Sequence, residues 1–179
     1  MNDPLDKITA GDDLFGKIKN FLSGFVGYVD RDNRREADKL LRLTVAQRLE
    51  EQWERIAGLQ RRLIKEKQLE KVDDLEDAAI KLRAFENRIR TASYGYSGLF
   101  DAVQINSKEL ELIYEYDVAL LEGVDQISNA IDNLSASIGT DGFPAAVRHL
   151  VTLSDEMVVA FDRREEVILA TVDSTGSEE

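Results

Sequence analysis

The sequence predicts an all-α protein, an antiparallel bundle of about five helices. Apolar residues recur every three or four positions over long stretches, which is the spacing of one helix face. Proline occurs only at position 4 and at position 144, which is the first position of the last predicted helix, where proline is tolerated. The breaks between stretches are short, so successive helices should be antiparallel neighbours. Residues 1–172 are expected to form one domain, with a disordered acidic tail at 173–179 and helices at about 13–29, 33–66, 71–92, 107–138 and 144–172.

The first helix, residues 13–29, has an apolar stripe rich in aromatic rings, with lysines beside it. Glycines within it each cost up to ~1 kcal/mol relative to alanine, so it needs a surface to lie on. That surface is a membrane interface, a groove on a partner protein, or the core of the bundle itself. The residues that would contact a partner or membrane are Leu14, Phe15, Ile18, Phe21, Phe25 and Tyr28.

The second and third helices form either a hairpin or one continuous rod, because neither Gly nor Pro separates them. The apolar stripe loses phase near residues 65–67. Basic residues before this point and acidic residues after it suit a helix end followed by a helix start, which favours the hairpin. An amphipathic helix followed by a charged hairpin resembles, in outline over about residues 13–92, the phage-shock and ESCRT-type membrane-remodelling proteins. No residue role is transferred from this outline.

The fourth and fifth helices each carry one charge in an otherwise apolar seam. Asp117 interrupts the heptad line of the fourth helix, and Arg164 interrupts the line of the fifth. If Ile138 faces Val147 across the turn, opposite residues have numbers that sum to about 285 in an antiparallel hairpin. The two charges then fall within one turn, and we predict a partly buried ion pair. The alternative is that both side chains extend into solvent.

The charge of the chain is −12, but residues 31–67 carry 11 basic and 7 acidic side chains, a net +4. The overall field opposes binding to nucleic acid. Near the start of the second helix, basic and acidic residues alternate at helical contact spacing. This pattern predicts a solvated, ion-paired face, with contact to an anionic surface as the alternative. The residues are Arg31, Arg34, Arg35, Lys39 and Arg42, interleaved with Asp32, Glu36 and Asp38.

Residue counts restrict the chemistry. The chain has no cysteine and one histidine, His149, with Ala146 three positions before it. A disulfide framework, a cysteine zinc site and the Glu-x-x-His pairs of a di-iron bundle are therefore excluded. Neither a GxxxxGK[ST] loop nor a strand-linked GxGxxG loop is present. No catalytic residue, metal or cofactor is assigned, and a small-molecule ligand is not expected.

The segment 93–98 (SYGYSG) is the clearest interior break in the helical pattern. The aromatic residues around it, Tyr94, Tyr96 and Phe100, either form a partner-binding loop or cover the open end of the bundle.

These patterns favour two functions. The leading hypothesis is a non-enzymatic adaptor or regulatory protein that binds a protein partner or forms a homo-oligomer, with peripheral membrane attachment through residues 13–29 as a variant. The alternative is an enzyme or ligand-binding bundle whose pocket uses Glu115, Asp117 and Glu122. The acidic N-terminus is unlike a secretory signal, and the apolar stretch 20–29 is too short to span a bilayer. A cytoplasmic location is expected.

Overall fold

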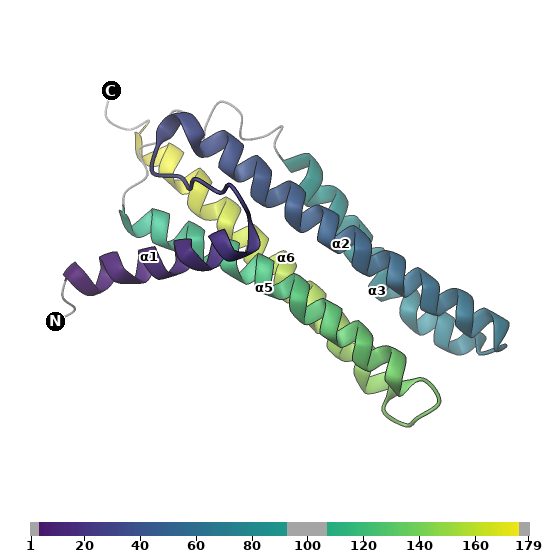
Figure 1. Cartoon of the computed structure of the whole chain (residues 1–179). Coiled ribbons are helices and arrows are strands. Elements are labelled where there is room, and N and C mark those ends of the chain that lie inside the picture. The colour runs from purple at the N-terminus through teal and green to yellow at the C-terminus, as the bar shows by residue number, and fades with distance from the viewer. Residues whose placement is uncertain (1–3, 93–106, 176–179) are drawn as a thin grey trace.

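The structure, a computed structural model, describes residues 4–92 and 107–175, with side chains described for 12–30, 32–92 and 107–170. In these residues it is all-α and contains no strand. Two long helical hairpins lie side by side, and a further helix, α1, crosses one of them (Figure 1). The predicted fold class, an antiparallel helical bundle, is confirmed.

The first hairpin consists of α2 (Arg34–Lys65) and α3 (Leu69–Thr91), preceded by a short 3₁₀ turn, η1 (Arg31–Asn33). The hairpin is therefore correct and the continuous rod is wrong. Lys67 turns the chain with a φ of 59°. Its N–H donates to the carbonyl of Ile64, and the N–H of Gln68 donates to the carbonyl of Leu63. These two bonds form a Schellman motif, which ends α2.

The second hairpin consists of α5 (Ser107–Ser137) and α6 (Phe143–Thr175). Gly139, with a φ of 84°, lies in the turn between them. The prediction of a disordered tail from residue 173 is wrong for 173–175, which continue α6. The predicted seams face the core: Leu120, Ile127, Leu150 and Phe161 are at most 1% exposed.

The first helix differs most from its prediction. α1 covers Pro4–Phe21, whereas the stripe predicted 13–29. Residues 22–30, which we call the strap, are not helical. Gly24 and Gly27 have φ values of 82° and 79°, a conformation that a right-handed helix excludes. A Cβ on Gly27 would lie 2.5 Å from the Tyr114 hydroxyl, so only glycine fits there.

Ion pairs show how the two hairpins align. On one side Arg48 and Arg55 of α2 pair with Asp125 and Asp132 of α5, each 77 residues later. On the other side Lys81 and Arg88 of α3 pair with Asp155 and Asp162 of α6, each 74 residues later. A constant difference means that α2 runs parallel to α5, and α3 runs parallel to α6. The cations are on the first hairpin and the carboxylates on the second.

Candidate functional site

Five polar side chains are buried together where the strap meets the two hairpins. Charged groups are rarely buried this completely unless they are paired. Each charge here therefore needs a partner inside the protein. The group, which we call the buried polar cluster, consists of Tyr28 on the strap, Asp38 and Arg42 on α2, Asp117 on α5 and Arg164 on α6; Tyr28, Asp117 and Arg164 are 0% exposed.

Arg164 joins α6 to α5 and α2. Its Nε donates to Asp117 Oδ1 at 2.6 Å, and its Nη2 donates to Asp38 Oδ1 at 2.8 Å. The Nη1 atom is buried and has no hydrogen-bond partner in the part of the chain that the structure describes. The seams of the fourth and fifth helices predicted a partly buried ion pair of Arg164 with Asp117; the structure places the two in direct contact, with both side chains fully buried. It adds Asp38, which the seams do not reveal.

Tyr28 ties the strap to this pair through both its side chain and its backbone. Its hydroxyl donates to Asp117 Oδ2 at 2.6 Å and accepts from Arg164 Nη2 at 3.1 Å. Its backbone N–H donates to the Tyr114 hydroxyl at 3.1 Å, and its carbonyl accepts from Arg34 Nε at 2.6 Å. The rings of Tyr28 and Tyr114 also stack, with centroids 5.4 Å apart. The strap is therefore fixed at this residue.

Arg42 extends the cluster to α3. Its Nε donates to Asp38 Oδ2 at 2.8 Å, and its Nη1 donates to the carbonyl of Ile89 at 3.2 Å. Both oxygens of Asp38 are thus bonded to arginines, one from α2 and one from α6. The cluster connects the strap with all four helices of the hairpins, and its two arginines balance its two carboxylates.

Burial and charge act in opposite directions on the ionisation of the cluster. Burial raises the pKa of Asp117 to about 6, although the positive charge of Arg164 and the Tyr28 hydroxyl lower it. Burial, and then the charge of Asp117, hold the pKa of Tyr28 well above its usual range, so the phenol stays protonated and donates. Burial lowers the pKa of Arg164, but the neighbouring Asp117, Tyr28 and Asp38 raise it by a larger amount. The net shift of this pKa is upward. At neutral pH the pair is ionised.

The hydrogen bonds of the cluster are made within the protein. Both oxygens of Asp117 accept from groups of the protein, and its side chain is enclosed. Glu115 and Glu122 are exposed and line different shallow hollows, one between α1 and α5 and one between α5 and α6. The three carboxylates proposed for a pocket are therefore not brought together. Among the described residues no group of three or more His, Cys, Asp or Glu side chains is placed to hold a metal.

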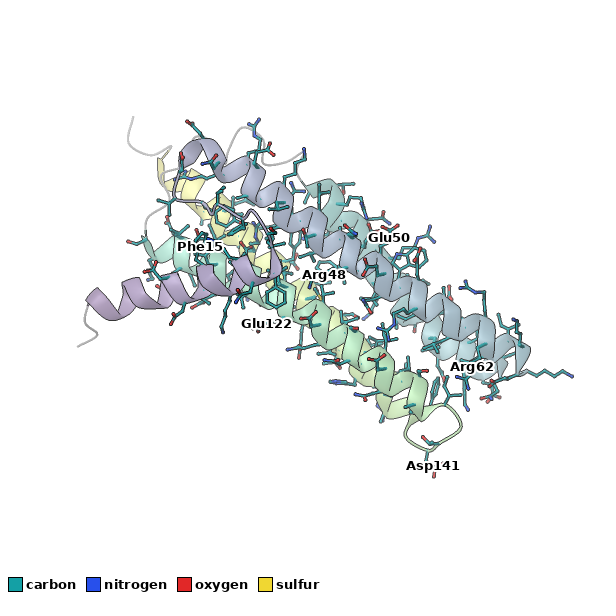
Figure 2. The ribbon with its side chains drawn as sticks, viewed as in Figure 1. Phe15, Arg48, Glu50, Arg62, Glu122 and Asp141 are labelled. Carbon is teal, nitrogen blue, oxygen red and sulfur yellow. The ribbon has the colours of Figure 1, made fainter. Side chains whose placement is uncertain are left out.

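The residues expected to contact a partner or membrane face the core, as the core alternative for the first helix predicted. Ile18, Phe25 and Tyr28 are at most 2% exposed. Leu14, Phe15 and Phe21 are half-buried and pack against the core. Phe15 lies where α1 crosses α5, and its ring centroid is 5.8 Å from that of Tyr114 (Figure 2). These six side chains therefore pack against the bundle in this structure, and their contact with a partner or membrane stays a prediction. The loop residues Tyr94, Tyr96 and Phe100 lie outside the described residues.

The start of α2 corrects another prediction. Arg34, Asp38 and Arg42 were expected on a solvated face, but they are 7%, 5% and 3% exposed. Their spacing of four places them on one line of the helix, next to the apolar stripe through Ala37 and Leu41. This position beside the apolar stripe was the sequence signal that the three side chains could be buried. The alternation of basic and acidic residues obscured this signal, because the same pattern is typical of surface ion pairs.

No described helix has the length and apolarity needed to cross a membrane. Comparison of the chain with protein-family models, with curated proteins and with solved structures finds no match. A function for this chain must therefore be inferred from its own geometry.

Proposed function

We propose that this chain is a non-enzymatic adaptor or regulatory protein that acts through contact with a helix of a protein partner or of a second copy of itself. One observation carries the proposal. α1 lies outside the two hairpins, packs mainly on α5, and is joined to α2 by the non-helical strap (Figure 1). A helix attached in this way can be exchanged for another helix without unfolding the hairpins.

The contact between α1 and α5 has the features of a peptide-recognition surface. Ile18 is fully buried, whereas Leu14 and Phe15 remain half-buried at its border. Lys17 and Asn20 are exposed and line the shallow hollow between α1 and α5. An amphipathic helix with the same spacing of apolar residues would fill the same face of α5. α1 would then act as a built-in occupant that a partner must displace.

The absence of cysteine permits a direct test, because a single introduced cysteine is the only thiol in the chain. The variant Ile18→Cys reports the release of α1, and Ile127→Cys, in the middle of α5, reports opening of the hairpin core. Both positions are 0% exposed. Their rates of reaction with a thiol reagent are measured with and without a synthetic peptide of residues 4–21, which serves as the surrogate partner.

We expect the thiol at position 18 to react faster than the thiol at position 127, because local opening requires less free energy than global unfolding. The peptide should accelerate the reaction at position 18 alone, and the same peptide carrying Ile18→Asp should have no effect. Equal rates at the two positions, with no response to the peptide, would show that α1 is a permanent part of the core and would contradict the proposal.

A further inference from the structure

The far end of the first hairpin combines exposed aliphatic side chains with a local excess of basic residues. Ile64 at the end of α2 and Leu69 at the start of α3 are 52% and 62% exposed. Around them, residues 61–71 carry five basic and two acidic side chains, a net charge of +3 in a chain of net charge −12. We call residues 61–71 the basic tip. Residues 67–71 of this segment also line a shallow hollow of about 430 Å³.

The cations of the basic tip differ from those farther along the first hairpin. Arg48, Arg55, Lys81 and Arg88 each pair with a carboxylate of the second hairpin. In the tip, Arg62 pairs with Glu66 at 2.9 Å. The remaining exposed cations form no ion pair with any residue that the structure describes: Arg61, Lys65 and Lys67. The series of ion pairs thus stops before the tip, although the helices continue.

Lys67 is placed where its side chain does not favour the fold. It is the residue at positive φ that ends α2, a position that glycine or asparagine normally occupies. A non-glycine residue is strained in this conformation. The chain therefore carries a lysine at the end of the molecule at some cost in stability, which indicates a role for this charge outside the folded core.

From these three features we infer that the basic tip docks on the surface of an anionic lipid bilayer, with Ile64 and Leu69 inserted at the interface and Arg61, Lys65 and Lys67 on the headgroups. Exposed aliphatic side chains flanked by cations are the composition of interfacial membrane contacts. The tip is also at one end of the molecule (Figure 1), where a flat bilayer can reach it without a matching groove. An acidic protein would need such a groove for the two aliphatic side chains.

The carboxylates near the tip limit the strength of this contact. Glu66 bonds with Arg62 and Gln68, so its charge is already shared within the tip. Glu70 lies at the start of α3, and Asp141 lies in the turn of the second hairpin at the same end of the molecule (Figure 2). With few unpaired cations, binding should be reversible and should weaken as salt concentration rises.

The test is co-sedimentation of the full chain with vesicles of phosphatidylcholine alone or mixed with phosphatidylserine. We expect salt-sensitive binding to the mixed vesicles only. Lys67→Gly should raise the thermal stability, because it relieves the positive φ, yet weaken vesicle binding about fivefold through the lost charge. Ile64→Ser with Leu69→Ser should weaken binding at least about tenfold by removing the inserted groups.

Matched controls carry the same changes away from the tip. Ile80→Ser alters an aliphatic side chain that is 56% exposed on α3, and Lys39→Gly alters an exposed lysine of α2. Both controls should retain full binding. The inference fails if no vesicle binds the chain, if the tip variants bind as well as the controls, or if a poly-glutamate peptide binds the tip while vesicles do not. None of these outcomes depends on whether α1 is displaced.

Discussion

The two ends of this molecule use charge in opposite ways. At the strap end, Asp117 and Arg164 lie inside the bundle, are 0% exposed and contact each other directly. At the tip end, Lys65 and Lys67 lie in solvent while Ile64 and Leu69 are exposed beside them. Between the two ends, the hairpins are joined by ion pairs at the surface, such as that of Lys81 with Asp155.

This difference shows that the contribution of an ion pair to the free energy of unfolding depends on whether the pair is buried or exposed. A buried pair gains little over apolar replacements, but losing one member leaves an unpaired charge in a medium that solvates it poorly. A surface pair is screened by water and ions, so its loss is tolerated. The strap end should therefore govern stability, and the tip end should be open to change without unfolding.

The largest expected effect is the loss of one charge at the strap end. Asp117→Ala or Arg164→Ala should each lower the free energy of unfolding by about 3 to 5 kcal/mol, because the other charge stays buried. A double-mutant cycle by denaturant unfolding should give a coupling above about 1 kcal/mol. A coupling below about 0.5 kcal/mol, as in exposed pairs, would contradict the direct pairing.

A variant without the charges sharpens this result. Because the Tyr28 hydroxyl bonds with both groups, replacing only the charged pair by apolar residues leaves that hydroxyl unpartnered. The combination Tyr28→Phe, Asp117→Leu and Arg164→Met should therefore be more stable than either alanine variant. Asp38 keeps Arg42 as its partner in this combination.

The next effect concerns pH. Asp117 has a folded-state pKa of about 6 against an ordinary value of 3.8, so the folded chain binds this proton more tightly than the unfolded chain. Its contribution to stability is greatest below pH 3.8 and falls as the pH rises through 6. Lowering the pH from about 7 to about 4 should therefore raise the unfolding free energy of the parent chain, relative to that of Asp117→Asn, by about 2 kcal/mol. A difference that is independent of pH would contradict the raised pKa.

A smaller effect should result from changing the strap residue. Tyr28→Phe removes one donor to Asp117 and one acceptor from Arg164, which should cost about 1 to 3 kcal/mol of unfolding free energy. It should also accelerate thiol labelling in the background of Ile18→Cys, because the strap holds α1 in place. Tyr116→Phe, on α5 outside the cluster, is the matched control and should change neither measurement.

The smallest effect is expected at the surface. Lys81→Gln removes the cation that bonds Asp155 at 2.7 Å between two exposed side chains. It should lower the free energy of unfolding by about 0.2 to 1 kcal/mol, and high salt should reduce the difference further. A loss comparable to that of Asp117→Ala would show that surface and buried pairs have equal weight, contrary to the comparison between the two ends.

The sequence by itself determined most of the helices, because helical periodicity is a local property. It favoured a hairpin of α2 and α3 over a continuous rod but left both open. It also predicted that Asp117 pairs with Arg164, since a shared turn sets the register of two antiparallel seams, but it left open that both side chains extend into solvent. It misjudged the end of α1, where Gly24 and Gly27 adopt positive φ and where the backbone at Gly27 packs closely against Phe15 and Tyr114.

Only the tertiary structure revealed that charges at the start of α2 are buried. Arg34, Asp38 and Arg42 have the alternating pattern of a solvated face, yet the strap and α6 cover them. The strap lies between 86 and 136 residues from the groups that Tyr28 bonds on α5 and α6. No local pattern encodes contacts over such distances, because they depend on how the hairpins align. That alignment is the physical reason why the cluster required the structure.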